Sequence, residues 1–345
     1  MGVEVSRTEV VQAFRPATAA GLEARTTRVG VAVPAALLFV LFHTSFAHAA
    51  DRYAVVITGA SGGSAYAEKY NTWRTALVTL LKEKLKYPDD RLFVLAESEG
   101  QNVAKATREN VRGLFDALRS RLAGDDTLFV LLIGHGTTAD NDEAKFNLVG
   151  PDLTSSEWSQ LLKPVPGRLV FIDTTGGSFP FMHRLAAPGR VVVTATDTAA
   201  QQFETIFPEF VIKAFDDPAA DGDKNGRVSI WEVFNYASAG VRQWFERNGQ
   251  LATERPLLDD NGDGAGREAQ NPGPDGALAR ATYLAPESTD TAGNDLLKRR
   301  EELERQLHDL RLRKASSPDP ARYDAEIEKV FVEIARLSRE ISSKP

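Results

Sequence analysis

Apolar and polar positions alternate along this chain in blocks, and the longest apolar block lies near its middle. Residues 128–133 are all apolar, and the run ends at Gly134-His135-Gly136. An unbroken apolar run of strand length predicts a strand that is buried on both faces of a parallel sheet. A second run of this kind, at 168–173, leads into Thr174-Thr175-Gly176. Ligands bind beyond the carboxyl ends of such strands, so His135 and Thr175 should face each other across a crevice if the strands are neighbours.

Shorter apolar runs and amphipathic segments predict the rest of the main domain. Strands are expected at 53–58, 91–96 and 190–196, with a short strand and turn at 146–151. Apolar residues at helical spacing predict helices at about 71–86, 107–122, 155–162 and 207–215. Alternation of strands and helices is typical of an α/β fold with a mostly parallel sheet and helices on both faces. The polar stretch from His135 to Lys145 predicts a surface loop.

Two segments near the C-terminus repeat apolar residues at intervals of three, four or seven. The first has leucine at 296, 303, 307 and 310, and the second runs from Tyr323 to Ile341 with coiled-coil spacing. A break at 315–320 separates them, so residues 290–345 predict an α-helical hairpin. The hairpin either packs on the main domain or acts as an arm for self-association or docking, and the pattern leaves both open.

The first 50 residues have the pattern of an export signal. Arg25 and Arg28 precede an apolar run at 29–42, and Ala47-His48-Ala49 follows with the spacing of a signal-peptidase site. The run is too short for a comfortable membrane span. We expect cleavage near Ala49 or Ala50 and a periplasmic or secreted protein, with an uncleaved N-terminal anchor as the alternative.

Length and composition restrict the remaining possibilities. The 345 residues suffice for one large domain, at 51–285, and the hairpin. Charged residues make up 26% and hydrophobic residues 42%, an ordinary globular balance. The net charge of −7 argues against a nucleic-acid partner. The chain has no cysteine, which excludes disulfides, thiolate metal sites and a cysteine nucleophile.

The glycine-rich loop at 59–63 resembles two functional motifs. As a dinucleotide-binding turn it lacks the last glycine, since Ala65 stands there, and no acid follows at the ribose distance. We therefore expect no nucleotide. The motif Gly-x-Ser-x-Gly would make Ser61 the nucleophile of an α/β hydrolase. In those enzymes, however, the sharp turn that carries the nucleophile lies deep in the sheet and does not follow the first strand. A plain loop at the end of a strand fits better.

Residues 221–232 match a calcium-binding loop of the EF-hand type. Gly226 allows the sharp turn, and a helix is expected to follow through Trp244. The alternative is a turn that caps this helix. A second acidic turn, at 259–264, has Gln270 where the last acid should stand, and it predicts a plain turn. The oxygen ligands of the first loop would be Asp221, Asp223, Asn225, the Arg227 carbonyl, Ser229 and Glu232.

Two of the strand ends resemble those of caspase-like peptidases, and the legumain branch with its bacterial relatives is most similar. In that family one buried strand ends in His-Gly and a later one in Asp-x-Cys-x-Ser-Gly. The resemblance covers residues 51 to about 284. It implies that His135 is the catalytic histidine, that Gly136 binds the oxyanion, and that Asp173 precedes the nucleophile. It also places Asp197 near the specificity pocket.

This chain departs from the family pattern at the nucleophile. Thr175 stands in place of the cysteine, and Gly177-Ser178 replaces Ser-Gly. A threonine hydroxyl is a much weaker acid than a thiol and needs a base in contact with it. We therefore expect a proteolytically inactive homologue that binds a peptide or protein segment. An endopeptidase that uses Thr175 or Ser178 with His135 is the alternative, and another activity on this scaffold is the third possibility.

Overall fold

The structure is a computed structural model that describes residues 50–139, 142–286, 294–315 and 317–342. The predicted export signal lies outside this part of the chain, apart from Ala50. No helix in the described ranges is both long and apolar enough to cross a membrane.

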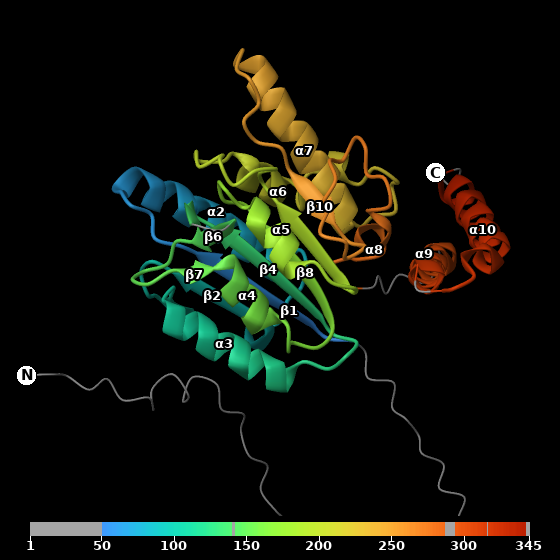
Figure 1. Ribbon diagram of the computed structural model, residues 1–345, viewed down its shortest axis with the longest axis horizontal. Coiled ribbons are helices and arrows are strands. Elements are labelled where there is room, and N and C mark those ends of the chain that lie inside the picture. Colours follow the sequence, from blue (N-terminus) through green and yellow to red (C-terminus); the bar gives the residue numbers. More distant parts are fainter. Residues whose placement is uncertain (1–49, 140–141, 287–293, 316, 343–345) are drawn as a thin grey trace, which may run out of the picture. The chain divides into compact units, whose positions relative to one another are not determined.

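A seven-stranded sheet with the strand order β10-β9-β8-β4-β1-β2-β3 forms the centre of the main domain (Figure 1). Neighbouring strands are parallel, except that β10 runs antiparallel to β9. The mostly parallel sheet is therefore confirmed. The strands are β1 (Arg52–Thr58), β2 (Leu92–Ala96), β3 (Val103–Lys105), β4 (Thr127–Ile133), β8 (Arg168–Asp173), β9 (Arg190–Thr194) and β10 (Leu257–Asp259).

Helices cover both faces of this sheet, and each face has its own apolar core. Alternate residues of β1 point to opposite faces, so Ala54 and Val56 belong to one core and Val55 and Ile57 to the other. The apolar residues of β4 are all fully buried, which explains why its sequence is an unbroken apolar run. The first core includes α2 (Ser64–Glu83), α6 (Phe207–Ala214) and α7 (Ile230–Arg247), and the second α3 (Arg108–Arg121), α4 (Ser155–Leu162) and α5 (Phe179–Leu185).

A second, smaller sheet follows His135, where a surface loop was predicted. Its three antiparallel strands are β5 (Gly136–Ala139), β6 (Glu143–Phe146) and β7 (Leu153–Thr154). The prediction of a loop to Lys145 was therefore wrong. Of the short strand and turn predicted at 146–151, the strand was wrong, since β6 ends at Phe146. In β6, buried and half-buried residues alternate, as is typical of a strand. The pattern covers only four residues within a polar stretch, so it does not predict a strand from the sequence.

The predicted bounds of α3, α4 and α6 agree with the structure to within one or two residues, whereas the start of α2 differs. Helix α2 begins at Ser64 and not near Asn71, so it carries additional aromatic residues towards His135. The side chain of Thr107 caps α3. Helix α4 has the predicted bounds, and Thr154 caps it through a capping box with Glu157. Strands β3 and β10 and helices α5 and α8 (Ala277–Arg280) were not predicted because they are short.

The C-terminal segment forms the predicted pair of helices, α9 (Asn294–Ala315) and α10 (Asp324–Ser342). They share an apolar cluster that is separate from the two cores of the sheet. Phe331 and Val332 of α10 point outward and are 56% and 62% exposed. The buried members of the cluster are Leu303, Leu307, Leu310, Val330 and Leu337.

Candidate functional site

The loops that follow β4 and β8 meet at one edge of the sheet. The two strands are parallel neighbours, with Leu132 opposite Asp173, so the carboxyl ends of both lie together. A Cβ atom at Gly136 would lie 2.7 Å from Thr175 Oγ1 and 2.2 Å from the Gly176 carbonyl oxygen. Only glycine at position 136 therefore allows this close approach. The structure thus brings together the predicted loops of His135 and Thr175.

Thr175 is fully buried, and its hydroxyl and backbone amide are both hydrogen-bonded. Its hydroxyl donates to Asp173 Oδ1 at 2.8 Å, and its backbone amide donates to the same oxygen at 2.9 Å. These are the groups that the family resemblance would assign to the nucleophile and to an oxyanion-binding amide. In this arrangement both serve to satisfy a buried carboxylate instead.

Asp173 is a fully buried carboxyl group at the end of β8. Burial raises its pKa to about 6, and the two hydrogen bonds from Thr175 oppose this shift. Its Oδ2 atom has no hydrogen-bond partner among the described residues. The loss of a donor on Oδ1 would leave the carboxylate held by a single bond.

The His135 imidazole is half-exposed and packs against the start of α2. Its Nε2 atom lies 3.0 Å from the Ser61 carbonyl oxygen, and the Tyr70 hydroxyl lies 3.2 Å from both ring nitrogens. The Tyr66 ring makes an edge contact with the imidazole at a centroid distance of 4.7 Å. No hydrogen bond joins His135 to Thr175 or Ser178 in the described part of the chain. The helix start that the sequence pattern missed supplies both tyrosines.

Ser178 is also fully buried and acts as a link between two loops. Its Oγ atom accepts from the amides of Ala195 at 3.1 Å and Thr196 at 3.3 Å, and it lies 3.2 Å from Thr196 Oγ1. These contacts tie the loop after β8 to the end of β9. A serine engaged by two backbone donors is placed to hold the backbone.

Residues 197–206, which we call the covering loop, pack over the loop that carries Thr175. A Cβ atom at Gly176 would lie 2.5 Å from the Phe203 carbonyl oxygen. The Thr205 hydroxyl donates to the Thr174 carbonyl, and the Thr138 hydroxyl donates to the Ala199 carbonyl. No periodic pattern of apolar residues predicts this loop, since it joins positions far apart in the chain through single hydrogen bonds.

The covering loop ends on a buried glutamate. Glu254 accepts from the amides of Ile206 at 2.9 Å and Phe207 at 3.1 Å. Burial raises its pKa to about 7, against these two hydrogen bonds. At the start of the loop, Asp197 is half-exposed and forms an ion pair with Arg255 at 3.5 Å. Its charge is thus partly neutralised within the protein.

Ser61, the alternative hydrolase nucleophile, lies in the loop after β1. It is buried, and its hydroxyl donates to Glu97 Oε2 at 2.6 Å. His135 contacts the Ser61 carbonyl and not its hydroxyl. The geometry therefore gives Ser61 no base in the position of a general-base histidine.

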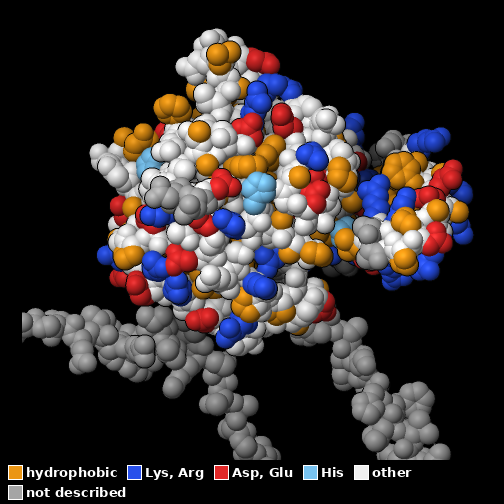
Figure 2. Space-filling view, in the orientation of Figure 1, with side chains coloured by type: hydrophobic (Ala, Val, Ile, Leu, Met, Phe, Trp, Pro, Cys, Tyr) orange, Lys and Arg blue, Asp and Glu red, His pale blue; other side chains and the backbone are white. Residues whose placement is uncertain are grey.

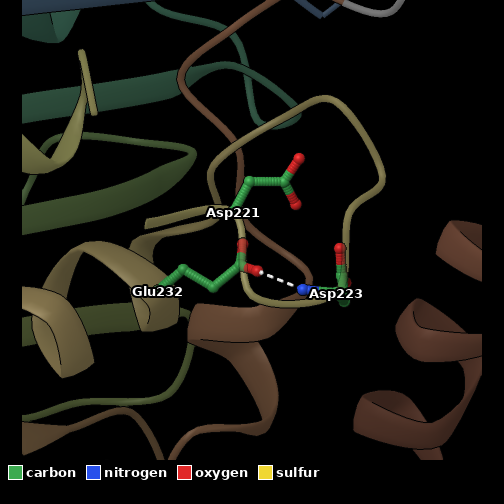
Figure 3. Close-up of side chains that lie close together, drawn as sticks. All are labelled: Asp221, Asp223 and Glu232. Atoms are coloured by element: carbon green, nitrogen blue, oxygen red, sulfur yellow. Dashed lines mark hydrogen bonds between the residues drawn. The ribbon is translucent and has the colours of Figure 1, made fainter. Parts of the chain in front are cut away.

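The predicted calcium loop forms a compact turn before α7, and three of its carboxylates converge. Ligand atoms of Asp221, Asp223 and Glu232 lie within 4.8 Å of one another (Figure 3). Glu232 Oε1 accepts from the amides of Gly222 at 3.0 Å and Asp223 at 3.3 Å. Gly226 has a φ of 80°, which glycine adopts without strain. Carboxylate oxygens at this spacing fit a hard cation such as calcium.

Two further predicted ligands have roles of their own in this turn. The Ser229 hydroxyl caps α7 in a capping box with Glu232, so a cation would reach it most easily through water. Asn225 Oδ1 accepts from the Arg227 amide at 2.8 Å. The interpretation as a helix-capping turn predicts the same capping box, and only metal binding separates the two interpretations.

The electrostatics of the calcium loop favour a cation. Burial raises the pKa of Asp221 and of Glu232, and the negative charge of Asp223 raises both further. The Arg300 guanidinium of α9 bonds to Asp223 and to Glu304, at 3.0 Å in the latter case. One side of the loop thus already has a positive partner, while Asp221 and Glu232 remain close together.

Charged side chains of both signs are interspersed over the α/β part of the surface seen in Figure 2, with small groups of hydrophobic side chains between them.

Comparisons with known proteins add little to this description. No family model and no curated protein matches the chain. The chain is similar to the crystal structure of protein GSU0716 from Geobacter sulfurreducens, a structural-genomics target, at 13% identity and a TM-score of 0.41. That similarity covers 68% of this chain and 98% of the other, and we draw no conclusion about function from it.

Proposed function

We propose that this chain is a homologue of the caspase-like peptidases, of the legumain branch, that binds a peptide or protein segment beside His135 without cleaving it. The proposal rests on the motifs that end β4 and β8. These strands are neighbours in the sheet, as a shared site between the two motifs requires. In this proposal the loop at 221–232 holds one calcium ion with a structural role.

The observation that carries the proposal is that the hydroxyl and the imidazole are bonded to different partners. A hydroxyl nucleophile requires a base within hydrogen-bond reach. The Thr175 hydroxyl donates to Asp173, and His135 Nε2 contacts the Ser61 carbonyl. Each group is therefore held by its own neighbour. Threonine is also restricted at χ1, because it is branched at Cβ, so its hydroxyl does not swing freely towards the imidazole.

The covering loop adds a second obstacle to catalysis. Thr175 has no exposed surface, and the carbonyl of Phe203 packs on the adjacent Gly176. A substrate carbonyl must come within about 3 Å of a nucleophile to react. Asp173 could accept the hydroxyl proton, but this pair does not meet solvent or substrate while the loop is closed.

The groups that remain accessible suit binding. His135 is half-exposed, Tyr66 is 37% exposed and in contact with it, and Phe203 on the covering loop is 72% exposed. Aromatic rings next to a polar imidazole provide apolar contact area with one hydrogen-bonding group. We therefore expect a peptide or protein segment with an apolar or aromatic side chain as the ligand.

In the described part of the chain, no histidine is hydrogen-bonded to the hydroxyl of any of the enzymatic alternatives. Catalysis by Ser178 would require the loss of its hydrogen bonds from two backbone amides. Catalysis by Thr175 would require both the opening of the covering loop and a new direction for the hydroxyl. Catalysis by Ser61 would have to use Glu97 as its base, because the Ser61 hydroxyl donates to this carboxylate and His135 contacts only the Ser61 carbonyl.

Restoration of the missing thiol tests the proposal. Peptidase activity on a defined tetrapeptide library is measured for wild type, Thr175→Cys, His135→Ala and the double variant. Wild type should not exceed His135→Ala, and any activity of Thr175→Cys should disappear in the double variant. Hydrolysis by wild type that His135→Ala abolishes would show a working hydroxyl nucleophile and refute the proposal.

Binding is measured separately on the same proteins. Fluorescent members of the library are titrated with wild type, His135→Ala and Phe203→Ala, and Phe331→Ala serves as the control for loss of an exposed ring elsewhere. The two site variants should weaken binding by about tenfold or more, and the control should not. Equal affinities in all four proteins would place the binding surface elsewhere.

A further inference from the structure

The acidic turn after β10 has the same backbone geometry as the calcium loop before α7. In the first loop the fourth and sixth residues, Lys224 and Gly226, have φ angles of 57° and 80°. In the second loop, counted from Asp259, the fourth and sixth residues are Gly262 and Gly264, with φ angles of 82° and 74°. Two left-handed residues at the same spacing bend both loops in the same way.

Three hydrogen bonds also recur at equivalent positions of the two loops. In each loop the side chain of the first residue accepts from the amide of the sixth, that of the third from the fifth, and that of the fifth from the seventh. The first and second loops therefore direct equivalent side-chain oxygens inward. The bonds are Gly226–Asp221 (2.8 Å), Asn225–Asp223 (3.0 Å) and Arg227–Asn225 (2.8 Å) in the first loop, and Gly264–Asp259 (2.5 Å), Asp263–Asn261 (2.8 Å) and Ala265–Asp263 (2.7 Å) in the second.

The second loop lacks an acid at its twelfth position, but another carboxylate reaches it from further along the chain. Asp275 Oδ1 accepts from the amides of Asp260 at 3.2 Å and Asn261 at 3.4 Å. Asp275 is only 4% exposed, and its Oδ2 atom is buried without a hydrogen-bond partner. A buried carboxylate oxygen without a donor is unfavourable, and a bound cation would satisfy it.

The charges that surround Asp275 do not stabilise its unpaired oxygen. Asp260, next to Asp259, is engaged elsewhere, because its carboxylate caps α8 by accepting from the amides of Gly276 at 2.7 Å and Ala279 at 2.8 Å. The negative charges that act on Asp275 come from Asp259, Asp260 and Asp263. The repulsion among these carboxylates would be relieved by a divalent ion.

We propose that this loop is a second site for a divalent cation of the calcium class, with Asp275 in the role that Glu232 has in the first. Its ligands would be the side chains of Asp259, Asn261, Asp263 and Asp275 and the Ala265 carbonyl, all oxygen donors of the kind that calcium prefers. These carboxylates are more widely spaced than those of the first loop, since only the first loop has three within 4.8 Å. The ion would therefore draw Asp275 inward, directly or through a bridging water.

Such a site would stabilise the edge of the main sheet. Asp259 is the last residue of β10, the antiparallel strand at that edge, and Asp275 lies just before α8. An ion between them would close the loop at 260–276 onto the strand. The site is independent of the proposed peptide binding, because it uses none of the residues around His135.

Calcium counting by equilibrium dialysis of the exported chain tests the proposal. At millimolar calcium we expect two ions in wild type, one in Glu232→Gln, one in Asp275→Asn and none in the double variant. Asp89→Asn, with a side chain 76% exposed and far along the sequence from both loops, is the control and should keep two. If Asp275→Asn does not fold, Asp263→Asn serves instead, because Asp263 lies at the surface.

Either of two results would overturn the second site. Wild type would bind no ion beyond the one that Glu232→Gln removes, and both Asp275→Asn and Asp263→Asn would bind as wild type does. The second turn would then be held by its own hydrogen bonds alone. Binding of no ion by any variant would likewise refute it.

Discussion

The Thr175 hydroxyl lies 2.8 Å from Asp173 Oδ1, in a hydrogen bond that is completely buried. The Thr175 amide donates to the same oxygen, so a single residue provides both donors to this carboxylate. The position that would carry the nucleophile in a caspase-like peptidase therefore stabilises a buried acid here. This relationship makes the effect of a substitution at position 175 predictable.

Thr175→Val should destabilise the protein by about 1–3 kcal/mol, because it removes one of the two donors to a buried carboxylate. The pKa of Asp173 is about 6, so the carboxyl is charged above this pH and needs the donor most there. The cost in the free energy of unfolding should therefore be larger at pH 8 than at pH 5. Thr175→Ser keeps the hydroxyl and is the control. A cost that does not depend on pH would contradict the prediction.

Calcium should stabilise the protein through the loop at 221–232. Extracellular calcium modules bind with dissociation constants of about 10⁻⁴–10⁻³ M, so 10 mM calcium should add roughly 1.5–3 kcal/mol. Thermal unfolding is compared with and without calcium in an Asp263→Asn background, in which the second loop does not contribute. Glu232→Gln in that background should abolish the shift. Equal shifts in both proteins would show that the loop is only a turn.

Deletion of residues 290–345 should leave the main domain folded. The apolar cluster of α9 and α10 is separate from the two cores of the sheet, so their removal opens neither core. We expect a single cooperative urea transition for residues 51–285, with some loss of stability because Arg300 no longer bonds to Asp223. Loss of cooperative unfolding would show that the helix pair belongs to the core.

The same deletion tests whether the helix pair mediates self-association. Sedimentation of both proteins is compared over a range of concentrations. If the exposed Phe331 and Val332 of α10 contact a second copy, only the full chain should form a larger species. Monomers in both cases would favour a helix pair that acts within one chain.

The sequence predicted features whose cause is local or periodic. The apolar runs predicted β4 and β8 and their burial, and the spacing of oxygen donors predicted a loop in which Asp221, Asp223 and Glu232 converge. Contacts between distant positions could not be predicted in this way. The covering loop is held by single bonds such as that from Thr138 to Ala199, and such bonds leave no pattern in the sequence.

Short elements beside the site also escaped prediction, and this affected the interpretation of the site. The start of α2 carries Tyr66 and Tyr70 to His135, but no apolar stripe marks this part of the helix. Asp275 could not be assigned to the acidic turn, because it reaches the turn from outside the twelve-residue pattern.

Export should be visible at the N-terminus of the mature protein. The motif Ala47-His48-Ala49 follows the apolar run, so cleavage after Ala49 or Ala50 should leave Ala50 or Asp51 as the first residue. Mass spectrometry of the intact protein from the periplasm or the medium measures this. A protein that still carries Met1 would favour the uncleaved anchor.

The last prediction concerns the pH dependence of the covering loop. Glu254 is 3% exposed and holds the end of the loop through the amides of Ile206 and Phe207. Its pKa is raised by burial from 4.5 to about 7, so the folded state binds this proton more tightly than the unfolded state does. The resulting stabilisation is complete below about pH 4.5 and is lost as the pH rises through 7. Glu254→Gln cannot ionise and should escape this loss.

We therefore expect wild type to lose on the order of 2–3 kcal/mol relative to Glu254→Gln between pH 5 and pH 8, as measured by urea unfolding. Glu209→Gln changes an exposed acid on α6 and should follow wild type. Amide hydrogen exchange in the covering loop, corrected for its intrinsic pH dependence, should rise with pH only where Glu254 is present. Because this loop covers Thr175, any peptidase activity of Thr175→Cys should also be greater at pH 8 than the thiolate fraction alone explains. Parallel pH profiles for wild type and Glu254→Gln would show that Glu254 does not control the loop.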